Sequence, residues 1–183
     1  MRDDPLWVFG YGSLIWNPGF EHLERRIAWL DGWHRSFCMR SIHHRGTPDR
    51  PGLVLALDAW PGARCTGVAF AVERAREAET LDYLRERELV SAAYFETRQP
   101  ITLDDGREVT GVTYVIDPDH DQYCGGLPLE EQASIIARAH GGRGPNPDYL
   151  LSTAAHLEEL GIADDDMRWL AGRVRRLTAQ QKG

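Results

Sequence analysis

The first segment that could do chemistry is a glycine loop near the amino terminus. It directly follows the apolar run 6–10 and consists of Gly10, Tyr11, Gly12, Ser13 and Leu14. A loop of this kind after a strand can aim several backbone N–H groups at one carboxylate or carbonyl oxygen. It matches neither the GxGxxG dinucleotide motif nor the GxSxG and SxxK motifs of serine nucleophiles. The residues alone leave two interpretations open, a ligand-binding loop or a tight turn that requires glycine.

Glu88 is the second candidate, at the end of a helix predicted over residues 74–88. Leu84 and Leu81 lie four and seven residues before it, which places Glu88 on their apolar helix face. Burial on that face would raise the pKa of the carboxyl group, as suits a general base that works near neutral pH. Arg74 and Glu77 fall near the same face, so a solvated helix end with alternating charges is the alternative.

Two further residues could contact a substrate. Arg45, in the polar loop 43–48, could offer its guanidinium group to an anion. Tyr149, in the first turn of a helix predicted over 147–160, could place its hydroxyl near a ligand at the positive end of that helix. Taken alone, Tyr149 could equally be a core aromatic residue.

No metal site and no cysteine nucleophile are predicted. Adjacent residues such as His43 and His44 rarely face one ion, and neither HxH nor HExxH spacing accompanies them. The three cysteines, Cys38, Cys65 and Cys124, are odd in number and lack CxxC spacing, which argues against a disulfide framework and a zinc ribbon. Such cysteine usage favours a reducing compartment.

The elements that must position these residues follow from turn signals and composition. A short strand is expected at 6–10. Three hairpins are expected around turn residues such as Asp31-Gly32, and their strands are 26–30 with 33–38, 53–57 with 66–72, and 94–103 with 108–116. Helices are predicted at 74–88, 129–140, 147–160 and 164–177, the third capped by Asn146. Antiparallel hairpins with inserted and appended helices predict an α+β fold. A small closed or nearly closed barrel is expected, since closure removes exposed strand edges.

Length, composition and net charge further limit the class of protein. The chain has 183 residues, which indicates one domain over 1–183, and the Gly/Pro-rich run 141–147 is expected to join two of its helices. A hydrophobic fraction of 42% with six Trp is typical of a folded chain, and a net charge of -7 argues against nucleic-acid and anionic-membrane partners. The acidic start and the interrupted apolar stretch 5–20 do not match a signal peptide or a membrane span. We therefore predict a cytoplasmic protein that is monomeric, since no heptad pattern is present.

Several short blocks together resemble the ChaC family of γ-glutamylcyclotransferases. They occur in the family's order over most of the chain: Val8–Trp16 (VFGYGSLIW), His44-Arg45-Gly46 with Pro51-Gly52, Tyr83-Leu84 before Arg87-Glu88, and Asn146 with Tyr149-Leu150. The YGSL block is shared with other γ-glutamylcyclotransferases. Its combination with HRG and the late NxxYL is much more specific to ChaC.

The resemblance implies a γ-glutamylcyclotransferase-like fold, which is a small, mostly antiparallel β-barrel with flanking helices, those of 129–177 packed on the barrel. It also implies a cytosolic lyase that cleaves glutathione into 5-oxoproline and cysteinylglycine without a metal or organic cofactor. Carried over to this sequence, Glu88 is the catalytic acid/base, the loop from Gly10 to Leu14 binds the γ-glutamyl part, and Arg45 and Tyr149 are further substrate contacts. After Glu88 the chain departs from many relatives with Leu89–Ala93, which bears on substrate preference.

In the implied reaction, the substrate's α-amino group attacks its own γ-carbonyl carbon, a tethered five-membered ring closure. Glu88 would take a proton from the amine and deliver one to the leaving nitrogen, while amides of the loop would hold either the carbonyl oxygen or the α-carboxylate. Two alternatives stay open. One is a cyclotransferase for another γ-glutamyl amine or peptide, and the other is a non-catalytic, regulatory module that binds γ-glutamyl compounds.

Overall fold

The computed structural model describes residues 4–89 and 92–181. Val90 and Ser91, which belong to the departure from the family pattern after Glu88, lie outside the described residues, as do residues 1–3 and 182–183. The chain divides into two compact units, residues 1–35 with 57–121 (unit 1) and residues 36–56 with 122–183 (unit 2). A single domain over 1–183, with its C-terminal helices packed on the barrel, therefore stays a prediction.

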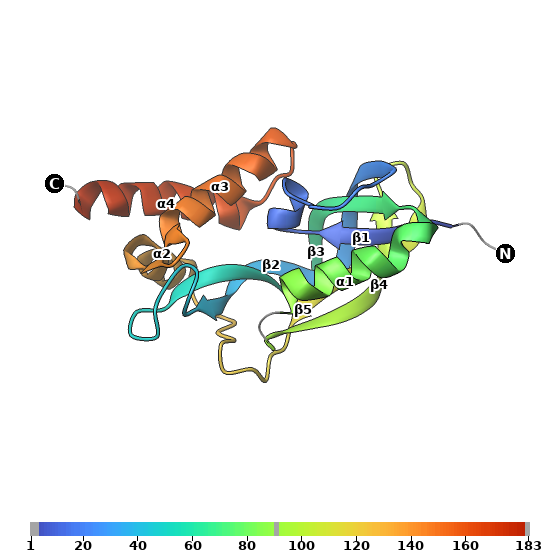
Figure 1. The fold of residues 1–183 in the computed structure, drawn as a ribbon. Helices are drawn as coiled ribbons and strands as arrows, with labels where there is room; N and C mark the ends of the chain where they lie inside the picture. Colours follow the sequence, from blue (N-terminus) through green and yellow to red (C-terminus); the bar gives the residue numbers. More distant parts are fainter. Residues whose placement is uncertain (1–3, 90–91, 182–183) are drawn as a thin grey trace. The chain divides into compact units, whose positions relative to one another are not determined.

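Strands among the described residues close into a barrel in the order β1-β3-β2-β4-β5. Their bounds are β1 Leu6–Gly10, β2 Glu24–Ser41, β3 Gly52–Val72, β4 Tyr94–Leu103 and β5 Glu108–Ile116. β1 pairs antiparallel with β3 and parallel with β5, and that parallel contact completes the closure (Figure 1). The predicted α+β class and the mostly antiparallel barrel are confirmed.

Two predicted hairpins are wrong, because each is one long strand. The runs 26–30 and 33–38 both belong to β2, and the runs 53–57 and 66–72 both belong to β3. Gly32 and Gly62 adopt φ values of 86° and 85° inside these strands, a conformation that lets a strand bend locally without reversing. The third predicted hairpin is confirmed, since β4 and β5 pair antiparallel around Gly106, whose φ is 91°.

Helix α1 (Glu77–Glu88) covers part of the barrel in unit 1 (Figure 1). It confirms the helix predicted at 74–88, except that residues 74–76 form a 3-10 turn, η2. Leu81 and Leu84 of α1 join one apolar cluster with side chains of β1, β3 and β5; its members are Leu6, Val8, Leu14, Val72, Leu81, Leu84, Val112 and Tyr114. This packing fixes the rotation of α1 about its own axis and so the direction in which Glu88 points.

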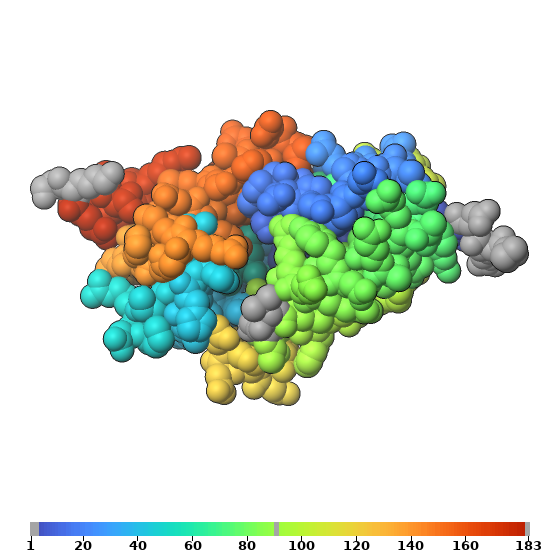
Figure 2. All heavy atoms as spheres, in the orientation of Figure 1, coloured from blue at the N-terminus to red at the C-terminus, as the bar shows by residue number. Residues whose placement is uncertain are grey.

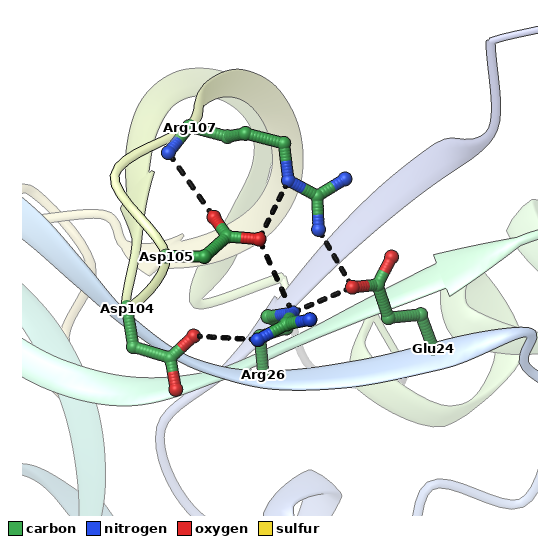
Figure 3. Close-up of polar contacts among 5 residues, drawn as sticks. All are labelled: Glu24, Arg26, Asp104, Asp105 and Arg107. Atoms are coloured by element: carbon green, nitrogen blue, oxygen red, sulfur yellow. Dashed lines mark hydrogen bonds and ion pairs between the residues drawn. The ribbon is translucent and has the colours of Figure 1, made fainter.

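A second set of contacts joins the start of β2 to the β4–β5 turn (Figure 3). Arg26 pairs with Glu24 at 2.6 Å and with Asp104 and Asp105 at 3.4 Å, and Arg107 pairs with Glu24 at 2.6 Å and with Asp105 at 2.8 Å. We call these five residues the β-end ion cluster. It lies next to the point where Ala28 of β2 pairs with Leu103 of β4.

Unit 2 contains three mutually packed helices, α2 (Leu129–Arg138), α3 (Asn146–Glu159) and α4 (Asp165–Gln181). All three helices were expected from the sequence. The run 141–147 connects α2 to α3, as predicted, and contributes to a short pair of strands, β6 (His140–Gly141) and β7 (Gly144–Pro145). Within the described residues, no helix has the length and apolar character that crossing a membrane requires.

Candidate active site

Glu88 is the last residue of α1, and its side chain keeps 20% of its exposure. Burial raises the pKa of its carboxyl group, and the charge of Arg87, whose Nε lies 3.4 Å from Glu88 Oε1, partly opposes that rise. A carboxyl group with a raised pKa accepts a proton more readily than an ordinary surface carboxylate and can return it. The burial predicted from Leu81 and Leu84 is therefore present, and the alternative of a fully solvated helix end is wrong.

Glu96, on neighbouring β4, has the opposite electrostatic environment. Arg85 donates two hydrogen bonds to it, at 2.9 and 3.0 Å, and Tyr114 donates a third at 2.9 Å. These donors, Arg85 above all, lower the pKa of Glu96 despite its partial burial. The pKa values of the Glu88 and Glu96 carboxyl groups are thus shifted in opposite directions.

Tyr114 is buried and contacts Glu96. Burial is the main cause that raises the pKa of its phenol, followed by the hydrogen bond to Glu96, and the negative charge of Glu88 adds to the rise. The hydroxyl therefore remains protonated and donates to Glu96. The negative charge of Glu88 thus acts on a hydroxyl group that is already hydrogen-bonded to Glu96.

Arg87 links α1 to the glycine loop. Its guanidinium donates to Ser13 Oγ at 3.0 Å, to the carbonyl oxygens of Asn17 and Pro18 at 2.6 and 3.2 Å, and to the hydroxyl of Tyr83 at 3.2 Å. In the space-filling view, the blue segment that follows β1 lies directly against the green end of α1 (Figure 2). Since Arg87 also contacts Glu88, one side chain spans the distance between the loop and the candidate base.

The glycine loop itself is tightly built. A Cβ on Gly10 would lie 2.9 Å from Leu14 Cβ, so glycine is required there by close packing. Ser13–Ile15 form a 3-10 turn (η1), and the first amides of such a turn have no acceptor inside it. Of the two interpretations of the sequence, the tight turn is present, and it still leaves these amides suited to bind an oxygen.

Arg35 is a buried charge that sequence reasoning missed. It is only 5% exposed, and its Nε donates to the carbonyl oxygen of Tyr11 at 2.9 Å, while both of its Nη atoms donate to Thr66 O, Nη1 at 3.0 Å. A buried guanidinium between two backbone carbonyl groups fixes the loop to β3. Its sequence neighbours, His34 and Ser36, are polar, so the local sequence does not mark this arginine as buried.

Arg45 and Tyr149 contact each other in unit 2. The Arg45 guanidinium carbon is 5.6 Å from the centre of the Tyr149 ring, and its Nη1 donates to Pro145 O at 3.2 Å. The Tyr149 hydroxyl accepts the Leu55 N–H at 3.2 Å, and Phe37 packs edge-on against its ring. The partly buried ring thus packs against Phe37 while its hydroxyl contacts the backbone, and a contact with a ligand stays a prediction.

Asn146 has a role that differs from the predicted one. It does not cap α3, because the helix begins at Asn146 itself and no side-chain cap is formed. Its fully buried amide accepts the Leu53 N–H at 2.8 Å and donates to Leu53 O at 2.9 Å, as another strand would. Gly52 allows this approach, since a Cβ there would lie 2.6 Å from Asn146 Oδ1 and 2.4 Å from Arg45 O.

His43 and His44 belong to a loop held by backbone contacts. Their carbonyl oxygens accept N–H groups of Gly142 and Arg143 at 2.7 and 2.8 Å. Burial, with nearby Arg143, lowers the pKa of His44. Across residues 4–89 and 92–181, no three His, Cys, Asp or Glu side chains gather in a way that could hold a metal ion.

Comparison with solved structures defines the class of fold. The structure superposes on the glutathione-specific γ-glutamyl cyclotransferase from yeast with a TM-score of 0.84, at 24% identity, covering 95% of this chain and 97% of that one. A structure described as γ-glutamyl cyclotransferase aligns with a TM-score of 0.57 at 17% identity, over 91% of this chain and 86% of that one. The fold is that of the γ-glutamylcyclotransferases.

The family follows from sequence comparison. Residues 6–177 match the family model described as ChaC-like protein, and the chain belongs to that family. It is 39% identical to the glutathione-specific γ-glutamylcyclotransferase of Escherichia coli (strain K12), over 97% of this chain and 76% of that protein. It is 32% identical to glutathione-specific γ-glutamylcyclotransferase 1 of Homo sapiens, over 88% of this chain and 73% of that protein.

Proposed function

We propose that this protein is a glutathione-specific γ-glutamylcyclotransferase, a lyase that converts glutathione to 5-oxoproline and cysteinylglycine. The names of its bacterial and human relatives support the substrate, since each is called glutathione-specific. The observation that carries the proposal is the environment of Glu88, a mostly buried carboxyl group with a raised pKa that Arg87 joins to the glycine loop.

The reaction needs one group that accepts and returns a proton. At neutral pH the substrate's α-amino group is protonated and cannot attack. Glu88 removes one of its protons, and the nitrogen bonds to the γ-carbonyl carbon and loses a second proton as the ring amide forms. The amide bond to the cysteinyl nitrogen breaks as that nitrogen receives a proton from Glu88, and it takes up the second proton as the free amine. Atoms balance without water or an oxidant, so the proposed chemistry calls for neither a metal nor an organic cofactor.

The glycine loop supplies the second requirement, which is stabilisation of negative charge. Charge develops on the γ-carbonyl oxygen during ring closure, and amides at the start of η1 are of the type that stabilises such an oxyanion. Gly10, Tyr11, Gly12, Ser13 and Leu14 are proposed to bind the γ-glutamyl part. Arg87 and Arg35 fix this loop from two sides, which supports its use as a rigid binding surface.

Arg45 and Tyr149 are proposed as further substrate contacts. A guanidinium beside an aromatic ring, as these two residues form, is suited to a carboxylate such as that at the glycine end of glutathione. The enzyme is further proposed to act as a monomer in the cytoplasm, where reduced glutathione occurs.

The test is incubation of the purified protein with reduced glutathione, with 5-oxoproline and cysteinylglycine followed by mass spectrometry. Equal amounts of both products are expected, and their formation is expected to persist with a metal chelator present. A γ-glutamyl amino acid and a γ-glutamyl amine serve as parallel substrates. Turnover of one of these in place of glutathione would contradict the proposed specificity, and binding of glutathione without turnover would contradict the enzymatic proposal altogether.

A further inference from the structure

Two cysteines of unit 2 lie directly opposite each other on adjacent chain segments. Met39 of β2 forms an antiparallel bridge with Tyr123, so the next pair in register is Cys38 with Cys124. Backbone hydrogen bonds flank the bridge, from Cys124 N–H to Cys38 O at 2.8 Å and from Arg40 N–H to Gln122 O at 2.7 Å. Side chains of directly opposed residues project from the same face of an antiparallel pair.

The separation of the two backbones suits a disulfide bond. Hydrogen-bonded antiparallel pairs have Cα atoms about 5.5 Å apart, which is inside the range of roughly 4.4–6.8 Å that a disulfide bond spans. Both residues are thiols in the structure, with Cys38 buried and Cys124 partly exposed.

We propose that Cys38 and Cys124 are a reversible oxidation site, at which a low-molecular-weight disulfide such as glutathione disulfide converts the two thiols to an intramolecular disulfide. The Cys124 thiolate attacks one sulfur of that disulfide, which forms a mixed disulfide and releases one thiol. The Cys38 thiolate then attacks the Cys124 sulfur and releases the second thiol. Two electrons pass from the protein to the reagent, and the two cysteine protons end on the two released thiols.

The surroundings of Cys124 set the speed of the first step. Burial raises the pKa of its thiol, Glu131 adds to this rise, and Arg40 opposes it. Because only the thiolate attacks, the exchange is slow at neutral pH and accelerates as the pH increases. This dependence distinguishes Cys124 from an exposed, low-pKa cysteine.

The disulfide would join the two segments at which the chain passes from unit 1 into unit 2. Cys38 and Cys124 each lie three residues into unit 2, after the boundaries at Arg35/Ser36 and Asp121/Gln122. The bond would close a long loop that contains β3, α1, β4 and β5, and closing a long loop restricts the unfolded chain. The oxidised protein is therefore expected to have a higher Tm than the reduced protein.

The test uses the full chain, reduced and then treated at pH 8 with glutathione disulfide, denatured, alkylated, and digested with trypsin without reduction. The expected product is peptide Ser36–Arg40 linked to peptide Glu108–Arg138, with Cys65 alkylated in peptide Cys65–Arg74. Dithiothreitol should release the two peptides. The inference concerns sulfur chemistry only, so it does not depend on the proposed enzymatic function.

Two variants serve as matched controls. Cys65→Ala should still give the linked peptides, and Cys124→Ser should give none, with Cys38 remaining alkylatable after denaturation. Three alkylated thiols in the treated wild-type protein, a stable glutathione adduct on Cys124, or a link that includes Cys65 would each overturn the proposal. The result on the wild-type protein decides it even if a variant does not fold.

Discussion

At the residue scale, the carboxyl groups of Glu88 and Glu96 differ in what surrounds them. Glu96 accepts hydrogen bonds from Arg85 and Tyr114, whereas the mostly buried Glu88 has the Nε of Arg87 at 3.4 Å. The pKa of Glu88 is therefore raised and that of Glu96 is lowered. Such a separation of pKa values supports the proposed acid/base role of Glu88.

The raised pKa of Glu88 predicts a cost in stability. The folded protein holds the Glu88 proton more tightly than the unfolded chain, so the free energy of unfolding falls as the pH rises from the unfolded pKa through the folded one. Glu88→Gln removes the charge and should increase the Tm at pH 7, with little change in acid. Thermal unfolding at pH 7 and in acid checks this expectation. A Tm difference between Glu88→Gln and wild type that is less favourable to the variant at pH 7 than in acid would contradict it.

Arg87 is predicted to position the loop and to tune Glu88. Arg87→Ala removes the contacts with Ser13, Asn17 and Pro18, so turnover should fall roughly 10- to 100-fold, and the free energy of unfolding should fall by about 2–4 kcal/mol. The charge that lowers the pKa of Glu88 is also lost, so the acid limb of the pH–rate profile should move to higher pH.

Arg87→Lys is the matched control, because it keeps the charge but loses the forked donors. Its acid limb should stay near that of wild type while its turnover falls. An unchanged acid limb in Arg87→Ala would show that Arg87 acts on stability alone.

At the element scale, the start of α3 depends on a side chain that imitates a strand. Asn146→Ala would leave the Leu53 N–H and C=O groups buried without their amide partner, at a cost of about 2–4 kcal/mol in the free energy of unfolding. Urea unfolding measures this cost. Asp148→Ala, at an exposed position in the first turn of the same helix, is the control and should change stability little.

The same helix illustrates what local sequence can and cannot predict. Asn146 followed by Pro147 correctly located the start of α3, since both residues favour a helix terminus. The partner of the Asn146 side chain is 93 positions away, at Leu53, so no local pattern could identify it. The hairpin turn predicted at Asp31-Gly32 was wrong for a related reason. A glycine with a positive φ can form a bend within a strand as well as a turn.

At the scale of the whole molecule, strand content and hairpin signals predicted a barrel, but not how it closes. The closure requires β1 to lie parallel to β5, with Trp7 opposite Gly111, a contact between distant segments. The helix periodicity of residues 81–88 correctly predicted that Glu88 is largely buried, because burial on a helix face is a local property. Arg35 was missed, since a buried arginine is revealed only by the carbonyl groups that it reaches.

The β-end ion cluster should stabilise the barrel in a salt-dependent manner (Figure 3). Arg26→Gln removes contacts with Glu24, Asp104 and Asp105, and is expected to lower the Tm by a few degrees at low ionic strength. The loss should shrink in 1 M salt, which reduces the Debye length to about 3 Å. Arg25→Gln, at an exposed neighbouring position, is the control.

Acid should abolish the Tm difference between wild type and Arg26→Gln. The pKa values of Glu24 and Asp105 are lowered, mainly by hydrogen bonds from Arg26 and Arg107, respectively. Their contribution is therefore present above the unfolded pKa and is lost as the pH falls through the folded pKa. A Tm difference between wild type and Arg26→Gln that persists in strong acid and high salt would assign the effect to packing instead.

The most direct test of the central claim compares Glu88→Gln with Glu86→Gln, a change at an exposed position on the same helix. Turnover of glutathione to 5-oxoproline is measured for both variants, with circular dichroism to verify the fold. Glu88→Gln should be slower than wild type by roughly 10²- to 10⁴-fold, and Glu86→Gln should match wild type. Near-normal turnover by folded Glu88→Gln would contradict the assignment of Glu88 as the acid/base.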